Sequence, residues 1–180
     1  MFSFSALMRA MDERTGTFSE GEIREAYAAL HQRVQGFADS GDWSGFADCF
    51  TEDATYVEHV YGTFHGRTEI RDWCVRTMSA FPGSAMVEFP LSWTVVDVPT
   101  SRLICEIGNV MPDPGDGSVH SATNLTIVTY AGDGLFSCEE DVYNPMRFLT
   151  TTLRWAEVAE RHGRLGDEGR AYVAAYGGRG

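Results

Sequence analysis

Lysine is missing from this sequence of 180 residues, and all fourteen basic side chains are arginine. A Schiff base with a substrate and the attachment of pyridoxal phosphate both need a lysine amine, so both chemistries are excluded. A phosphate-binding loop that depends on its lysine is excluded for the same reason. The preference for arginine is typical of a GC-rich bacterial genome and says nothing about function.

Positive charge is scarce overall, since the formal net charge is −12. A surface this acidic repels nucleic-acid phosphates and anionic lipid head groups, so we expect neither as a partner. No apolar run is long enough to span a bilayer, and the first residues lack the positive cluster and cleavage pattern of a signal peptide. The sequence therefore predicts a cytoplasmic protein.

The four cysteines are far apart and form no C-x-x-C pair; they are Cys49, Cys74, Cys105 and Cys138. Zinc-site and redox motifs of that type are therefore absent, and we expect four reduced thiols. The histidines and carboxylates also lack H-x-H, H-E-x-x-H and facial-triad spacing. We expect neither a metal nor an organic cofactor.

The chain reads as one domain over residues 19–160, with a lead-in over 1–18 and a glycine-rich tail over 161–180. Apolar residues at helical spacing predict a long helix from Ser19 to Gly41 and two further helices over 42–50 and 68–81. The stretch ATYVEHVY, over 54–61, lies between these two and reads as a strand. From residue 86 the apolar period changes to two, which predicts strands over 86–98, 101–111, 118–130 and 135–143. A last helix is expected around 149–158.

Helices that gather against one face of an antiparallel sheet make an α+β fold. We expect the sheet to be strongly curved and wrapped by the N-terminal helices, so that the domain forms a cone with an open mouth. Such a cone is a natural pocket for a small molecule.

Three stretches carry a family resemblance: GDWSGFADCFTEDATYVE, GTFHGRTEIRDW and TIVTYAGDGLFSCEEDVYNP. Over roughly residues 20–145 the chain resembles the SnoaL-like polyketide cyclases of the nuclear transport factor 2-like superfamily. The resemblance implies a cystatin-like α+β barrel, usually a homodimer, often without a metal or organic cofactor. The superfamily includes ketosteroid isomerases, dehydratases, epoxide hydrolases, cyclases and non-catalytic binding proteins, so the fold alone does not settle the function.

Neighbouring side chains on a strand point to opposite faces, so only one of Glu58 and His59 can face the interior of the cone. In the ketosteroid isomerases, which this stretch resembles, an acidic residue on the first strand removes the proton, and Glu58 falls at that position. A carboxylate that faces an apolar pocket loses hydration, which raises its pKa and makes it a proton acceptor. Tyr56 would share this face, whereas His59 and Tyr61 would face the helices or the rim. The alternative is that Glu58 points outward and His59 inward.

The chain departs from the ketosteroid isomerases at two positions. Val34 stands where that family places an oxyanion-stabilising tyrosine, and Thr126 stands where it places a protonated aspartate. The limonene-type epoxide hydrolases use an Asp–Arg–Asp set, and here Arg102 and Glu106 lie on the corresponding stretch with a different spacing.

Further polar residues occur on the later strands. His120, Asn124 and Thr126 share one parity and would line either the pocket or the outer surface. Glu139, Asp141 and Tyr143 share parity on the last strand, with Glu140 opposite, and we expect Asp141 and Tyr143 to point inward unless CEED is a solvated edge. Two carboxyls in one small cavity push their pKa values apart, which leaves one as acid and one as base.

These patterns lead to the hypothesis of a cofactor-independent acid/base enzyme that acts on a small, largely apolar organic substrate. The reaction would be a cyclisation, an isomerisation, a dehydration or the addition of water to an epoxide. The alternative is a non-catalytic small-molecule-binding or dimerisation module with the same fold. The candidate catalytic residues are Glu58, Asp141 and His120, and the candidate substrate contacts are Tyr56, His59, Tyr61, Trp73, Asn124 and Tyr143.

Overall fold

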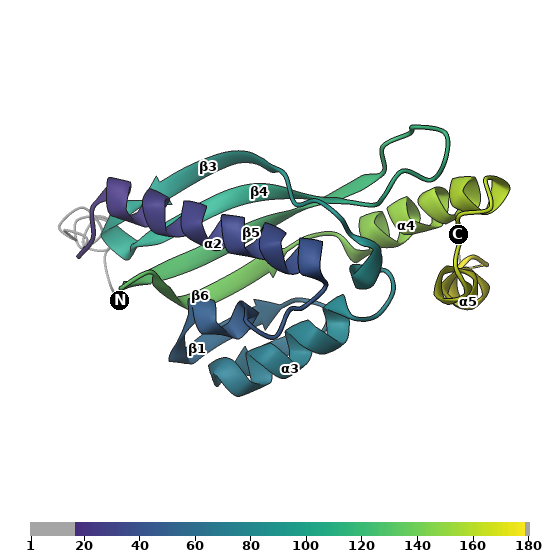
Figure 1. Ribbon diagram of the computed structural model, residues 1–180. Coiled ribbons are helices and arrows are strands. Elements are labelled where there is room, and N and C mark those ends of the chain that lie inside the picture. The colour runs from purple at the N-terminus through teal and green to yellow at the C-terminus, as the bar shows by residue number, and fades with distance from the viewer. Residues whose placement is uncertain (1–16, 179–180) are drawn as a thin grey trace, which may run out of the picture.

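The computed structural model describes residues 17–178 and contains a six-stranded sheet in the order β2-β1-β6-β5-β4-β3 (Figure 1). The lead-in expected over 1–18 therefore lies outside the described residues except for its last two. No helix within this part of the chain combines the length and apolarity that a bilayer crossing requires. The strands are β1 Phe50–Glu58, β2 Gly62–His65, β3 Leu91–Asp97, β4 Arg102–Val110, β5 Ser121–Gly132 and β6 Leu135–Val142. The helices are α2 Glu20–Ser40, α3 Gly66–Met78, α4 Pro145–Arg161 and α5 Asp167–Tyr176, with short 3-10 helices η1 Phe46–Cys49, η2 Gly83–Ala85 and η3 Val98–Thr100.

The predicted α+β fold with a curved sheet and N-terminal helices is confirmed, with two differences in the sheet. β1 pairs with β6 in the parallel direction, whereas all other neighbours are antiparallel, so the sheet is mixed. The sheet also stays open, with β2 and β3 at its edges. The parallel pair arises because the chain returns from β5 along β6 in the same direction as the much earlier β1.

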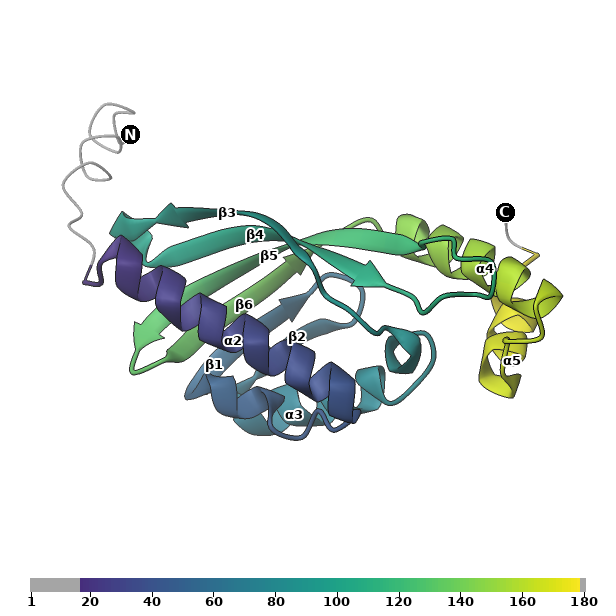
Figure 2. The ribbon, with the colours of Figure 1, turned by 45° about the horizontal axis from the view of Figure 1, so that its top comes forward.

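Helix α2 lies across one face of the sheet, and α3 lies beside β1 (Figures 1 and 2). Ser19 accepts the Glu22 N–H at the start of α2, and Gly41 ends the helix in the left-handed conformation that glycine tolerates. Ile23 and Leu30 lie on the buried side of the helix. These local signals fix the length of α2, and its apolar stripe fixes which side meets the sheet.

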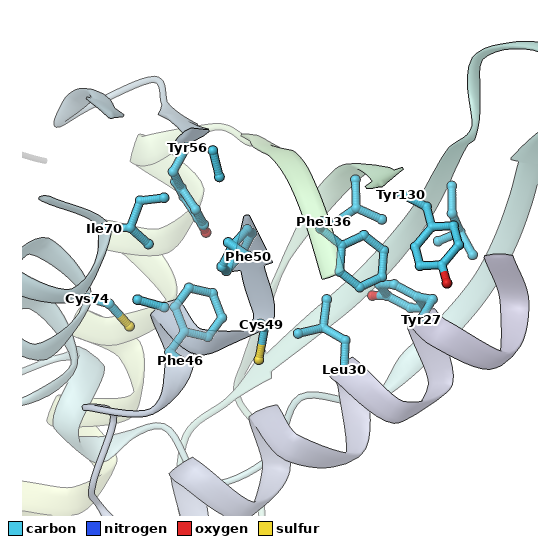
Figure 3. Packing of buried hydrophobic residues seen from close by; sticks show 14 of the residues in the cluster. Tyr27, Leu30, Phe46, Cys49, Phe50, Tyr56, Ile70, Cys74, Tyr130 and Phe136 are labelled. Carbon is cyan, nitrogen blue, oxygen red and sulfur yellow. The ribbon is translucent and has the colours of Figure 1, made fainter. Parts of the chain in front are cut away.

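The main core fills the space between α2, α3 and the concave face of the sheet. Phe50 of β1, Val128 of β5 and Phe136 of β6 are completely buried, and Phe46 and Phe50 pack edge to face (Figure 3). Each such side chain contributes about 1.5–3 kcal/mol of burial free energy. This core closes the narrow end of the cone and holds β1 beside β6.

A second, smaller core lies at the C-terminal end and differs from the expectation of a glycine-rich tail. Trp155, Ala156 and Ala159 of α4 pack with Leu165, and α5 follows directly. Figures 1 and 2 show α4 continuing beyond the end of β6 and α5 beyond α4. The helix includes the apolar run AYVAAY, and Leu165 and Val173 pack on an apolar surface that α4 provides.

Two helical glycines allow a matched test of this second core. A Cβ on Gly169 would lie 2.4 Å from Leu165 Cδ1, whereas a Cβ on Gly36 of α2 would meet nothing within 4 Å. We expect Gly169→Ala to lower the free energy of unfolding of the C-terminal helices by about 1–3 kcal/mol through overpacking. We expect Gly36→Ala to raise global stability by roughly 0.5–1 kcal/mol, because alanine is the better helix former. Hydrogen exchange of α5 and chemical denaturation measure the two effects, and equal stabilisation by both changes would contradict the packing described for α5.

Candidate functional site

A cavity of about 600 Å³ opens on the concave face of the sheet. This size is typical of pockets for drug-sized organic molecules. Its wall is mostly aromatic and apolar, and its polar groups are gathered on β1, β5 and β6. The aromatic residues that line it include Trp43, Phe46, Tyr56, Tyr61, Trp73, Phe81, Phe89, Tyr143, Phe148 and Tyr172.

Strand register brings the carboxyl groups of the cavity together. Glu58 of β1 lies opposite Asp141 of β6, and Asp141 lies opposite Thr126 of β5. Tyr56 lies opposite Glu139 in the same way, two residues along both strands. Because side chains alternate along a strand, all five residues point to the concave face and line the cavity.

Asp141 accepts three hydrogen bonds, all of them from side chains of the cavity. Its Oδ1 accepts hydrogen bonds from Thr126 Oγ1 at 2.6 Å and from Asn124 Nδ2 at 2.8 Å. Its Oδ2 accepts the hydroxyl of Tyr56 at 2.5 Å. The residue is only partly buried because it borders the cavity, but no basic side chain donates to it.

Tyr56 joins Asp141 to a second carboxyl. Its hydroxyl oxygen lies 3.2 Å from Glu139 Oε1 as well as 2.5 Å from Asp141 Oδ2. A phenol carries one hydrogen, so Tyr56 can donate to only one carboxyl at a time. The second contact is a hydrogen bond only when Glu139 is protonated and donates to the phenol oxygen.

Burial supports this division of protons. Burial raises the pKa of Glu139 well above its usual range, and the charge of Asp141 raises it further. Burial also raises the pKa of Asp141, but the hydrogen bonds from Thr126, Tyr56 and Asn124 oppose that rise. Glu139 has only the Tyr56 contact, and its Oε2 is buried without a partner. Burial and the lack of donors favour the proton on Glu139, and the three donors favour the charge on Asp141, as in an acid beside a base.

Glu58 faces the interior, and its side chain is only 4% exposed. Its Oε2 accepts the backbone N–H groups of Val60 at 2.8 Å and Tyr61 at 2.7 Å, and its Oε1 accepts the hydroxyl of Tyr143. Three donors around one carboxylate tie it to the turn between β1 and β2. This geometry suits an anion that fixes the turn and orients Tyr143, and its role as the base stays a prediction.

The two candidate histidines lie outside the cavity, which corrects their expected positions. His59 points to the opposite face of the sheet, where its Nε2 lies 2.9 Å from Glu140 Oε1, because it follows inward-facing Glu58. His120 precedes the start of β5 and contacts Ser118 at 3.0 Å. It has the parity of Asn124 but lies four residues before it, about 13 Å along an extended chain, and so misses the cavity.

The remaining candidates do line the cavity. Trp73 is buried, and its Nε1 has no hydrogen-bond partner. Tyr61 is largely exposed and lies at the mouth. The candidates found in the lining are Tyr56, Glu58, Tyr61, Trp73, Asn124, Asp141 and Tyr143. Arg102 and Glu106 are absent from the lining, so the structure does not bring an arginine to the carboxyl group of Asp141.

Sequence analysis missed several residues of the site. Glu139 shares the parity of Asp141, and this signal was sufficient to place it inside, but its contact with Tyr56 depends on pairing between β1 and β6. Asn109 of β4 donates to Asn124 Oδ1 at 2.8 Å. Tyr172 of α5 lines the cavity. It was not predicted as a site residue because residues 161–180 were expected to form a tail. Among residues 17–178 no group of three or more His, Cys, Asp or Glu is arranged to hold a metal ion.

Comparison with known families agrees with this architecture. The family model described as the SnoaL-like domain matches residues 19–119, which is more than half of the chain. The chain belongs to the SnoaL-like domain family. No curated protein matches the sequence.

Solved structures of SnoaL-like and related proteins share the fold at low sequence identity. A protein from Jannaschia sp. CCS1, provisionally named a SnoaL-like polyketide cyclase, is 14% identical with a TM-score of 0.57, and the match covers 73% of this chain and 92% of that one. An NTF2-like protein from Anabaena variabilis ATCC 29413 is 13% identical with a TM-score of 0.54, covering 71% and 93%. The epoxide hydrolase/cyclase-like enzyme SalBIII, named for a role in pyran ring formation in the polyether salinomycin, is 14% identical with a TM-score of 0.55, covering 72% and 95%. Identities this low establish the common fold and nothing further.

The neutral state of Glu139 predicts how stability depends on pH. The unfolded chain loses this proton near the ordinary value of 4.5, whereas the folded chain keeps it to a much higher pH. The free energy of unfolding of the native protein therefore falls as pH rises through this window, by about 1.4 kcal/mol per pH unit for one group. Glu139→Gln keeps the hydrogen-bonding shape of the acid without the titration, so its stability should fall less steeply above pH 4.5.

Urea unfolding at a series of pH values measures this difference. Glu140→Gln is the matched control, because Glu140 is the next residue on β6 and points to the opposite face. Parallel pH profiles for the native protein and Glu139→Gln would show that Glu139 is ionised in the fold.

Proposed function

We propose that this protein is a cofactor-independent acid/base enzyme acting on a small, largely apolar organic molecule. Asp141 is the base, and Glu139 is the acid that acts through Tyr56. The observation that carries the proposal is the position of the Tyr56 hydroxyl, 2.5 Å from Asp141 Oδ2 and 3.2 Å from Glu139 Oε1, beside a cavity of about 600 Å³. A base and an acid joined by one hydroxyl can accept and return a proton within one binding site.

We propose the following order of proton transfers. Asp141 takes a proton from the substrate and becomes neutral, so it no longer needs the proton of Tyr56. The Tyr56 hydroxyl can then donate to the substrate atom that gains negative charge. Glu139 donates its own proton to the Tyr56 oxygen in a second hydrogen bond. Donors that are already placed where charge develops lower the barrier most effectively, because they need no reorganisation.

Asp141 is preferred to Glu58 as the base for a geometric reason. Glu58 accepts two backbone N–H groups that also hold the turn between β1 and β2, so protonating it would loosen the fold. Asp141 is held by side chains that belong to the cavity. Glu58 acts instead as a positioning residue that orients Tyr143. The names of two similar structures, a polyketide cyclase and an epoxide hydrolase/cyclase-like enzyme, support the class of cyclisation, isomerisation, dehydration or water addition.

The role of Asp141 as a base can be tested with a generic carbon acid, which the cavity does not have to recognise specifically. Nitrobenzisoxazole opens its ring when one C–H proton is removed, and the released phenolate is coloured. We expect the native protein to catalyse this reaction and Asp141→Asn to lower kcat/KM by about 100-fold or more, since a positioned base contributes at least that much. Burial raises the pKa of Asp141, so the native rate should fall on acidification at a pH above the ordinary value of 3.8.

Glu140→Gln serves as the control for this assay, because it removes a neighbouring carboxyl that faces away from the cavity. It should retain the native rate. Equal activity in the native protein and in a correctly folded Asp141→Asn variant would refute Asp141 as the base, and absence of turnover in both would favour a binding protein.

We also propose that the protein is a homodimer that associates through the outer face of the sheet. Register places Trp93 and Val95 of β3 on the same face as Ile104, Leu125 and Ile127. Trp93 is 43% exposed and Val95 is 54% exposed. Glu106 lies between Trp93 and Leu125 in this row, so the face is an apolar patch interrupted by a carboxyl, and exposed apolar patches with polar rims mark protein interfaces.

Sedimentation velocity tests the dimer. Val95→Glu places a charge in the apolar face and should shift the protein to a monomer. Val119→Glu is the control, because Val119 is 79% exposed outside the strands of the sheet and should leave the dimer intact. A monomeric native protein would refute the proposal.

A further inference from the structure

The hydrogens of the polar side chains around Asp141 are all directed at protein acceptors. Asn109 Nδ2 donates to Asn124 Oδ1 and to a backbone carbonyl of β5. Asn124 Nδ2 donates to Thr126 Oγ1 and to Asp141 Oδ1. Thr126 and Tyr56 donate their single hydroxyl hydrogens to Asp141. This group therefore offers a ligand no hydrogen-bond donor while Asp141 is ionised.

Acceptor sites, by contrast, remain open. An ionised carboxylate has about four lone-pair sites, two on each oxygen. Asp141 Oδ1 receives two hydrogens, but Oδ2 receives only that of Tyr56. Glu58 is arranged in the same way, with one donor on Oε1 and two on Oε2. A ligand that brings a single donor completes either carboxylate, whereas an ether or ketone oxygen meets lone pairs.

The charge of the cavity lining disfavours anionic ligands. Three carboxyls, Glu58, Glu139 and Asp141, line the cavity, and no arginine does so among residues 17–178. The imidazole in the lining, that of His31, is engaged at Nε2 by Phe89 O at 2.7 Å. A buried anion without a counter-charge is strongly disfavoured. An anionic ligand would meet the carboxylates with nothing to offset its own charge.

An ammonium group fits less well than a hydroxyl. The carboxylates attract its charge, but it carries three hydrogens and each carboxylate has one acceptor site left, so burying it beside Asp141 leaves hydrogens without partners. The walls favour a flat ring, because Trp43, Phe46, Trp73 and Phe89 present aromatic surface to the cavity.

Trp73 Nε1 and Glu139 Oε2 are polar atoms in this wall that have no partner in the protein. Both atoms are covered, and both side chains are more than nine-tenths buried. Because both atoms are covered by protein, a ligand in the cavity reaches neither of them in this conformation, and the acceptor sites of Asp141 and Glu58 carry the inference.

We propose that the substrate is an uncharged ring compound with a hydroxyl group, and that this hydroxyl donates its hydrogen to Asp141 Oδ2. The inference rests on the proposed function in taking Asp141 as the proton acceptor. In the reaction the O–H bond of the substrate breaks, an O–H bond forms on Asp141, and the electron pair stays on the substrate oxygen, which becomes the nucleophile. Alcohols, phenols and enols belong to this class, whereas carboxylates, phosphates and ammonium compounds do not.

Four naphthalene probes of nearly equal shape separate these classes in calorimetric titrations of the full chain at neutral pH. β-Naphthol donates one hydrogen bond, its methyl ether donates none, β-naphthoate is an anion and β-naphthylmethylammonium is a cation. We expect β-naphthol to bind about tenfold or more tightly than each of the other three, because only it completes the acceptor site without adding charge or spare hydrogens. Binding of the ether or the anion as tight as that of the naphthol would overturn the proposal, as would a preference for the ammonium.

Two single-residue variants test whether Asp141 causes the preference for β-naphthol. Asp141→Asn should reduce the preference for β-naphthol over its ether by about tenfold, whereas Glu140→Gln should leave it unchanged. An unchanged preference in Asp141→Asn would overturn the assignment to Asp141, and the comparison of probes on the native chain needs no variant to fold. Failure of the ring-opening assay with the naphthol preference intact would refute the enzyme while the ligand class stands. The opposite pattern would refute the ligand class alone.

Discussion

One phenolic hydrogen placed between two buried carboxyls organises the site. Tyr56 cannot satisfy both Asp141 and Glu139, so the protein must keep a second proton on the pair, and burial places it on Glu139. Asn124 and Thr126 then commit their hydrogens to Asp141, which leaves Asp141 as the acceptor and Glu139 as the donor. The unequal number of donors, rather than a difference in residue type, distinguishes the two carboxyls and underlies the proposed roles of base and acid.

This arrangement depends on strand pairing more than on any single element. The parallel register of β1 and β6 sets Tyr56 against Glu139 and Glu58 against Asp141, and the antiparallel register of β5 adds Thr126 to the same row. A slip of β1 by one residue would turn Tyr56 and Glu58 to the outer face and separate them from Glu139 and Asp141. The buried Phe50 and Phe136, which also pair across β1 and β6, resist such a slip because their burial is lost with it.

The parts of this site that strand alternation controls could be predicted from the sequence, and the parts that depend on distant pairing could not. Alternation is local, so it groups Asn124 with Thr126 and Asp141 with Tyr143, whereas the face that each pair shares depends on how the sheet packs. His120 has the correct parity but lies before the strand begins, and an error of a few residues at an element end is invisible to a periodic pattern. The parallel pairing of β1 with β6 joins segments about eighty residues apart, and no local signal carries it. Helix α5 was missed because its docking surface belongs to α4 rather than to its own sequence.

The carboxyl cluster has a cost in stability, and it lies beside the main hydrophobic core, to which Tyr56 belongs. A neutral Glu139 with an unpartnered oxygen and a raised pKa at Asp141 both lower stability at neutral pH. The closed end of the cone offsets this cost with completely buried Phe50, Val128 and Phe136, whereas the mouth is built from the more exposed Tyr61 and from α5. The carboxyls are thus held against the main core, where packing fixes their geometry, whereas α5 beside the cavity packs on the smaller core. The reverse order would place the carboxyls and Tyr56 on the part of the fold that opens most readily, where their mutual positions would be less well maintained.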